Sequence, residues 1–140
     1  VTLRVDADPR LERMQADRGR LRQVLNNLIA NGLEAVDGVD QGWVQVTTRL
    51  EANPRGDMVV VTVSDNGHGF QKELLARVFD PYVTSKSRGT GLGLAIVKRI
   101  AEEHGGSVEA DNRAEGGAYV RVVLPVAAGA GAAQLQRDIA

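Results

Sequence analysis

The stretch "MVVVTVSD", from Met58 to Asp65, is apolar at nearly every position between Met58 and Val63. A half-exposed strand alternates apolar with polar residues, whereas a strand that is apolar on both sides must be covered on both faces. A chain of 140 residues holds about one domain. We therefore expect this segment to be a central strand, with the other elements of a single sheet arranged around it.

The segments that alternate apolar and polar residues supply the rest of the predicted sheet. Residues 1–8 alternate and stop near Pro9, which is typical of an edge strand. Residues 43–52 are β-branched and alternating, and predict a hairpin with residues 58–65 through a turn at 53–57. Residues 107–112 and 117–126 predict two more strands, joined by a turn over "RAEGG".

Two segments have helical rather than strand periodicity. Asp17 is a suitable N-cap for a helix ending near Val36, and the apolar stripe of this helix comprises Leu21, Val24, Leu28 and Ala35. Leu92, Ile96 and Ile100 recur every four residues and predict a second helix of about three turns. Gly105 and Gly106 then supply its C-cap.

The order of these elements predicts the fold class. Residues 71–88 begin as a short helix and continue after Pro81 as a long loop, and long loops of this kind are usually functional. The remaining order of strands and helices indicates an α/β fold, a two-layer sandwich with a mixed, mainly antiparallel sheet covered on one face by helices.

Composition and charge exclude several classes of function. A net charge of −1 leaves no basic surface for nucleic acid or for an anionic membrane. The chain has no cysteine, so it holds no disulfide or thiolate metal site. No apolar run approaches the ~20 residues that span a bilayer, so this segment is expected to make no direct membrane contact.

The two ends suggest how the chain is organised. It begins with Val1 rather than methionine, so we expect it to be part of a longer protein. Residues 127–140 are rich in alanine and glycine and lose strand alternation. The predicted organisation is a domain over residues 1–126 followed by a tail or linker.

The stretch "SRGTGLGLAIVKRIAEEHGG" places Gly89, Gly91 and Gly93 directly before the second helix. A backbone without Cβ atoms approaches a ligand closely, and the N–H groups of a first helical turn bind anions, so phosphate fits here. The pattern is not a Walker loop, because no Gly-Lys-Ser/Thr follows, and the third glycine of a dinucleotide fingerprint would fall on Leu94 or Ile96. A flexible connection or a packing device is the alternative.

One face of the first helix carries Gln23, Asn27, Asn31 and Glu34, which are spaced four, four and three residues apart. Amide and carboxylate oxygens on one side of a helix suit a hydrated Mg²⁺, which takes few protein ligands. A solvated polar face is the alternative, although asparagine is a poor helix former and two in mid-helix need a reason.

The stretch "SDNGHGF" places Asp65 at the end of the predicted central strand, followed by Gly67 and Gly69. An aspartate there can accept a hydrogen bond from an exocyclic amine, and the glycines would let a flat ring lie against the backbone. An ordinary Asp-Asn-Gly turn is the alternative.

The stretch "FDPYVTSKSRG" carries aromatic and basic residues just before the glycines. Phe79 and Tyr82 are candidates to anchor an otherwise mobile loop, with Lys86 and Arg88 facing a phosphate. A surface loop with scattered basic groups is the alternative.

In combination, these motifs resemble the ATP-binding catalytic domain of sensor histidine kinases, in the Bergerat-fold (GHKL) superfamily that also holds type II topoisomerases, heat-shock chaperones and mismatch-repair ATPases. "NNLIANGLEA" resembles the N box, "DNGHGF" the G1 box, "FDPYVTSK" the F box and "GTGLGLAIVKRIAEEHGG" the G2 box. The resemblance covers about residues 1–126, and the wording is most similar to nitrogen-sensor kinases of the NtrY and NtrB kind.

The resemblance implies roles for individual residues. Asn31 would coordinate Mg²⁺, Asn27 would support it or contact phosphate, and Asp65 would bind the adenine amino group. Phe79 and Tyr82 would belong to the hinge of a flexible ATP lid. The ATP-binding residues implied in this way are Asn27, Asn31, Asp65, Gly67, Gly69, Phe79, Tyr82, Lys86, Arg88, Gly89, Thr90, Gly91, Leu92 and Gly93.

No catalytic residue is certain from the resemblance, with Asn27 and Lys86 in supporting roles. The family's phosphoacceptor histidine lies in a separate dimerisation domain, and neither His68 nor His104 fits its motif. Gly32 stands where the family usually has alanine, and is expected to weaken the helix slightly in an exposed interior.

The implied function is the kinase half of a two-component system. The domain would bind ATP and Mg²⁺ and pass the γ-phosphate to the histidine of its parent's dimerisation domain, from which a response regulator receiver domain would take it. The expected location is cytoplasmic, with a membrane-anchored parent left open. Two alternatives are a nucleotide-gated ATPase and a non-catalytic docking domain. The ATPase branches, like the anti-sigma serine kinases, carry a carboxylate where this chain has Asn27, and an amide cannot accept a proton from water.

Overall fold

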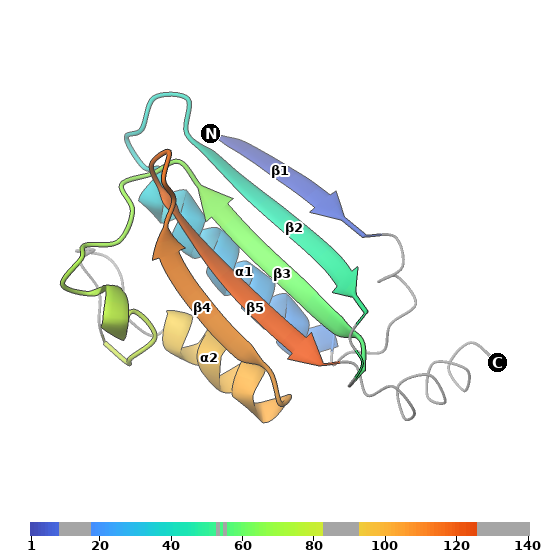
Figure 1. Cartoon of the computed structure of the whole chain (residues 1–140). Helices are drawn as coiled ribbons and strands as arrows, with labels where there is room; N and C mark the ends of the chain where they lie inside the picture. Colours follow the sequence, from blue (N-terminus) through green and yellow to red (C-terminus); the bar gives the residue numbers. More distant parts are fainter. Residues whose placement is uncertain (9–17, 53, 55, 83–92, 126–140) are drawn as a thin grey trace.

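The computed structural model describes residues 1–8, 18–52, 54, 56–82 and 93–125. Within these residues, five strands form one sheet in the order β1-β2-β3-β5-β4 (Figure 1). Their bounds are β1 Thr2–Ala7, β2 Trp43–Glu51, β3 Met58–Asp65, β4 Ser107–Asn112 and β5 Ala118–Pro125. The apolar segment 58–65 therefore occupies the middle of the sheet, as predicted.

The pairing of the strands agrees with the expected mixed, mainly antiparallel sheet. β2 pairs with β3, β3 with β5 and β4 with β5, all antiparallel, while β1 runs parallel to β2 at the edge. The hairpins β2–β3 and β4–β5 are those predicted from alternation. β1 belongs to neither hairpin. The chain passes through α1 between β1 and β2, and a crossover of this kind lets the two strands pair in parallel.

Two α-helices in the described part, α1 (Arg18–Ala35) and α2 (Gly93–Glu103), cover the same face of the sheet (Figure 1). Strand register aligns Val46, Val63 and Val120 in a row on that face. These residues share a buried cluster with α1 and α2, whose members include Val24, Leu28, Val97, Ile100 and Ala101. The predicted two-layer sandwich is confirmed.

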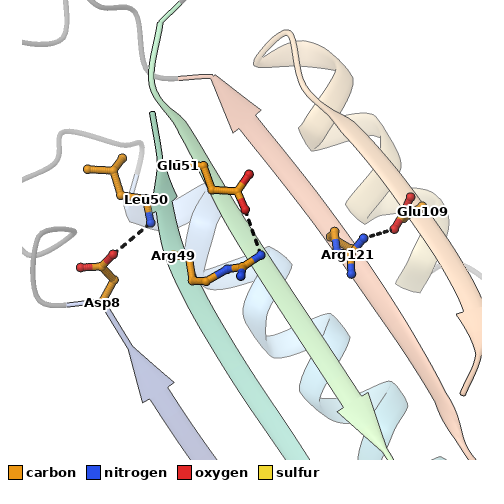
Figure 2. A network of polar contacts seen from close by, with 6 residues as sticks. All are labelled: Asp8, Arg49, Leu50, Glu51, Glu109 and Arg121. Atoms are coloured by element: carbon orange, nitrogen blue, oxygen red, sulfur yellow. Dashed lines mark hydrogen bonds and ion pairs between the residues drawn. The ribbon is translucent and has the colours of Figure 1, made fainter. Parts of the chain in front are cut away.

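No helix in the described part of the chain covers the opposite face of the sheet, which carries ion pairs. Arg49 pairs with Glu51 along β2 at 2.9 Å, and Arg121 of β5 pairs with Glu109 of β4 (Figure 2). Exposed pairs of this kind contribute about 0–1 kcal/mol each. Val60 is the one β3 residue on this face that is buried, so the central strand is covered only in part on its open side.

The edge strand is tied to β2 beyond its last ladder pair. The Asp8 carboxylate accepts the Leu50 N–H at 3.1 Å (Figure 2). The Asp8 N–H donates to the Thr48 carbonyl at 3.1 Å. These contacts extend the β1–β2 pairing to the point where the described segment ends.

Gly32 is buried, so the exposed helix interior assumed for it from the sequence is wrong. A Cβ at this position would lie 3.0 Å from Val44 Cγ1 and 3.2 Å from Val44 Cγ2. Val44 itself is 0% exposed. The glycine therefore lets α1 lie close against β2, immediately after Asn31.

The C-terminus of α2 has the predicted glycine cap. Gly105 has φ +75°, and its N–H donates to the Glu102 carbonyl at 3.0 Å. The Gly106 N–H donates to the Ala101 carbonyl at 2.8 Å, which completes a Schellman motif. The helix is thus fixed at the end opposite Gly93.

Candidate nucleotide site

Asp65 is the last residue of β3 and lies at the centre of the candidate site. It is 4% exposed, the one charged side chain found buried among the described residues. Its Oδ1 accepts the Gly67 N–H at 2.8 Å and the Ala118 N–H at 3.3 Å. Buried carboxylates need hydrogen-bond donors, and these two backbone donors fix the orientation of the side chain.

The loop after β3 is held against β2 by Asn66, a residue to which the sequence assigned no role. The Asn66 Oδ1 accepts the Trp43 N–H at 2.7 Å, and its Nδ2 donates to the Gln41 carbonyl at 3.2 Å. An asparagine in a turn usually forms a hydrogen bond with its own turn backbone. The partner here, Trp43, lies 23 residues away in the sequence, so no local pattern identifies this contact.

The same loop rests on the end of α1 through Gly67. A Cβ here would lie 2.1 Å from the Ala35 carbonyl oxygen, so no other residue fits without movement. The His68 N–H donates to that carbonyl at 3.2 Å. The requirement for glycine at this position therefore comes from packing against α1, and a role in shaping an adenine pocket remains a prediction.

The polar face of α1 lies next to the N-terminus of α2. The Asn27 Nδ2 donates to the Gly93 carbonyl at 3.5 Å, a long hydrogen bond between residues 66 positions apart. Asn27 and Asn31 are half-buried, whereas Gln23 and Glu34 are exposed. The structure thus brings Asn27 to the glycine that opens α2, with Asn31 one helical turn further along α1.

The two aromatic residues before the loop, Phe79 and Tyr82, differ in burial. Phe79 packs against the buried cluster, just after a 3₁₀ turn (η2, Leu75–Arg77) in which the short predicted helix is realised. Tyr82 is 76% exposed and packs against no part of the buried cluster, and its expected role at the hinge of the lid stays a prediction because the loop after it lies outside the described residues. Its φ of 65° is a left-handed conformation that is uncommon for an aromatic residue.

Six candidate residues lie outside the described part of the chain. They are Lys86, Arg88, Gly89, Thr90, Gly91 and Leu92. The proposed tail, 127–140, and the N-cap Asp17 also lie outside it.

The described residues offer oxygen ligands from amides rather than from a carboxylate cluster. No group of three or more His, Asp or Glu side chains within these residues could hold a metal ion. Mg²⁺ keeps several waters and takes one or two protein oxygens together with substrate phosphates, so the half-buried asparagine face fits it better than it fits Ca²⁺. None of the helices in the described segments is both long and apolar enough to cross a membrane.

Comparison with known proteins agrees with this geometry. A family model described as histidine kinase-, DNA gyrase B-, and HSP90-like ATPase matches residues 16–128. The sensor histidine kinase ZraS of Salmonella typhimurium is 42% identical over 129 residues, which are 91% of this chain and 26% of ZraS. The nitrogen regulation protein NtrY of Azorhizobium caulinodans is 42% identical over 114 residues, 77% of this chain and 14% of NtrY. The chain therefore spans about a quarter or less of these relatives.

Solved structures show the same fold. The catalytic domain of the histidine kinase ThkA has a TM-score of 0.72 at 33% identity, covering 89% of this chain and 78% of that one. Full-length ShkA in complex with AMPPNP has a TM-score of 0.68 at 31% identity, covering 88% of this chain and 25% of that one. The arrangement of the five-stranded sheet and two helices described above is that of a histidine kinase catalytic domain.

Proposed function

Because the chain belongs to the family of histidine kinase-, DNA gyrase B- and HSP90-like ATPases, we propose that it binds Mg-ATP between Asp65, the α1 asparagines and the N-terminus of α2. The resemblance to sensor histidine kinases is confirmed, and the chain is an ATP-binding catalytic domain of that type with the Bergerat fold. The observation that carries the proposal is the Asn27–Gly93 contact, which supports placing the N box beside the helix that follows the glycines.

Asp65 is proposed to recognise the adenine amino group. A carboxylate accepts several N–H donors at once, and Asp65 is already oriented by the Gly67 and Ala118 N–H groups. In a buried site, a fixed acceptor selects a base that presents an amino group and disfavours one that presents a carbonyl.

Asn27, Asn31 and the first turn of α2 are proposed to hold the phosphates and their metal. The N–H groups at a helix N-terminus favour anions. Asn31 would hold Mg²⁺ and Asn27 would support it. When bound, Mg²⁺ would neutralise the phosphate charge. Lys86, Arg88, Gly89, Thr90, Gly91 and Leu92 are proposed to complete the site as a lid.

The proposed reaction is transfer of the γ-phosphoryl group to a histidine on another domain. The bond between the γ-phosphorus and its bridging oxygen breaks, a bond to an imidazole nitrogen forms, and ADP leaves. Within this chain, His104 lies just after the end of α2, about 16 Å along the helix from Gly93. Its Nδ1 lies 2.8 Å from the Ile100 carbonyl oxygen and is hydrogen-bonded to it. His68 lies on the exposed part of the loop after β3.

The positions of His104 and His68 favour an acceptor histidine on the parent's dimerisation domain. A response regulator aspartate would then accept the phosphoryl group from that histidine. A cytoplasmic location follows from that partner and is proposed with it. We also propose a domain boundary near residue 126, because the sequence of residues 127–140 lacks the alternation of a strand.

The test is a calorimetric titration of the chain with ATP and Mg²⁺, comparing wild type with Asp65→Asn. Asparagine keeps an Oδ1 that can accept the Gly67 and Ala118 N–H groups, so the loop has the means to stay in place. Loss of a charged acceptor at a buried site should raise the Kd about 10- to 100-fold. Omitting Mg²⁺ should also weaken binding in wild type.

Asp57→Asn is the matched control, because Asp57 is exposed in the β2–β3 connection and its substitution removes the same charge. This variant should bind ATP as wild type does. Equal affinity in Asp65→Asn and Asp57→Asn, with both proteins folded, would refute the adenine assignment.

A further inference from the structure

The hairpin between β4 and β5 reaches back to the loop after β3 through Asn112. The Asn112 Oδ1 accepts the Phe70 N–H at 2.6 Å, and its Nδ2 donates to the Phe70 carbonyl at 3.0 Å. One amide side chain thus satisfies both backbone groups of a single residue, as a neighbouring strand would. Because the two partners are 42 residues apart, the contact fixes a loop end to a distant element.

Gly69 allows this contact to form. Its φ is +76°, and a Cβ there would lie 2.8 Å from the Asn112 Oδ1. Any side chain at position 69 would therefore both strain the backbone and displace the amide. The second glycine of the loop is explained by its fit against Asn112.

The same hairpin touches Asp65 from the other side. The Arg113 Nη1 donates to the Asp65 carbonyl at 3.2 Å and to the Gly116 carbonyl at 2.8 Å. The guanidinium also lies 4.8 Å from the centre of the Trp43 ring, which limits its rotation. A Cβ on Gly117 would lie 2.0 Å from the Asp65 carbonyl oxygen, so the turn and the end of β3 are in close contact.

We propose that Asn112 is a positioning residue for base recognition, holding the loop Asn66–Phe70 so that Asp65 selects adenine. The inference rests on the proposed nucleotide function and adds to it an element outside the four motifs. Asn112 acts through the Phe70 backbone and does not touch the nucleotide. Arg113 supports the same arrangement from the carbonyl side of Asp65.

The physical reason is the small number of constraints on this loop. Between Asp65 and η2 the described backbone runs outside the regular strand ladder. It is held by the side chain and N–H of Asn66 on Trp43, by the Gly67 N–H on the Asp65 carboxylate, by the Ala35 carbonyl and by Asn112. Releasing one of these supports lets the loop sample more conformations, and a mobile loop cannot hold a base-selective acceptor in one geometry. Selectivity between bases should then fall more than affinity for the shared triphosphate.

The experiment compares ATP with inosine triphosphate, in which a carbonyl replaces the adenine amino group. Calorimetric Kd values are measured for wild type, Asn112→Asp and Asn112→Ala, each shown by circular dichroism to be folded. Asn112→Asp keeps the acceptor but faces the Phe70 carbonyl with a second oxygen, and Asn112→Ala removes both bonds. Ser107→Asp adds the same charge at the other end of β4, about 16 Å away, as the matched control.

Wild type and Ser107→Asp should prefer ATP by at least about tenfold. In both Asn112 variants the Kd for ATP should rise about tenfold while that for inosine triphosphate changes less than about threefold. A variant that merely lost stability would bind both nucleotides less well by the same factor. An unchanged preference for ATP in folded Asn112 variants would overturn the inference while leaving the nucleotide site intact.

Failure of the proposed function has a different signature, since wild type itself would then show no preference or no binding. A second readout needs no nucleotide. Hydrogen exchange at the Phe70 amide should accelerate in Asn112→Ala relative to wild type, because the Asn112 Oδ1 is its acceptor. An unchanged exchange rate would show that the two Asn112–Phe70 hydrogen bonds, the Asn112 clamp, do not hold the loop.

Discussion

At the scale of single residues, three glycines around Asp65 are explained by the atoms that an added Cβ would meet. Gly67 meets the Ala35 carbonyl, Gly69 meets Asn112, and Gly117 meets the Asp65 carbonyl. Each lets two backbones or a backbone and an amide approach around Asp65. The sequence indicates that Gly67 and Gly69 let a flat ring lie against the backbone, with an ordinary turn as the alternative, and predicts that Gly117 is part of a turn. The structure shows that all three make room for neighbouring groups of the protein itself.

Gly32 is the residue at which packing and helix propensity oppose each other. Alanine is better than glycine in a helix by about 1 kcal/mol, but its Cβ would press on the fully buried Val44, and overpacking costs about 1–3 kcal/mol. We predict that Gly32→Ala lowers the free energy of unfolding by about 1 kcal/mol in wild type and raises it in a Val44→Ala background.

The measurement for this pair is urea denaturation of the two single variants and the double variant. The coupling free energy should favour the double variant by about 1–2 kcal/mol. Effects that add within about 0.5 kcal/mol would mean that β2 moves freely enough to accept the extra methyl group.

At the scale of elements, α2 is fixed independently at its two ends. Its first residue contacts Asn27 of α1, and its last turn closes through Gly105 and Gly106. The first end belongs to the proposed phosphate site and the second to the stability of the helix. Substitutions at the two ends should therefore have separable effects on nucleotide binding and on stability.

Gly105→Ala tests this separation. A residue with a Cβ at φ +75° costs about 1–2 kcal/mol, and the nearest neighbour, Pro125 Cγ at 3.7 Å, adds no clash. The free energy of unfolding from urea titration should fall by about 1 kcal/mol, while the Kd for ATP stays within about twofold of wild type. Gly105→Asn should lose less, because asparagine tolerates the left-handed conformation. A large loss of ATP affinity in folded Gly105→Ala would show that the ends are coupled.

At the scale of the whole molecule, the two hairpins, both helices and the position of Asp65 at the end of the central strand could be predicted from the sequence, because period, caps and turns are local. The clamp by Asn112, the tie by Asn66 and the fit of Gly32 could not, because each depends on a partner brought in by the tertiary fold. The unequal burial of Phe79 and Tyr82 could not be predicted for a related reason, since an aromatic residue in a motif does not reveal whether the fold buries it. The register and pairing of the strands determine which distant residues come into contact and which side chains are buried.

The amide at Asn27 determines which activity of this ATPase family the isolated domain should show. A carboxylate there could take a proton from water, and a general base accelerates such steps about 10²–10⁴-fold, whereas an amide cannot act as a base. Phosphate release measured with saturating Mg-ATP should therefore be slow, on the order of one turnover per hour, as in phosphate sites without an activated water. Binding and hydrolysis are separate here, so the same sample should still give a saturable calorimetric signal. Hydrolysis at several turnovers per minute, lost in Asp65→Asn, would instead indicate a nucleotide-gated ATPase.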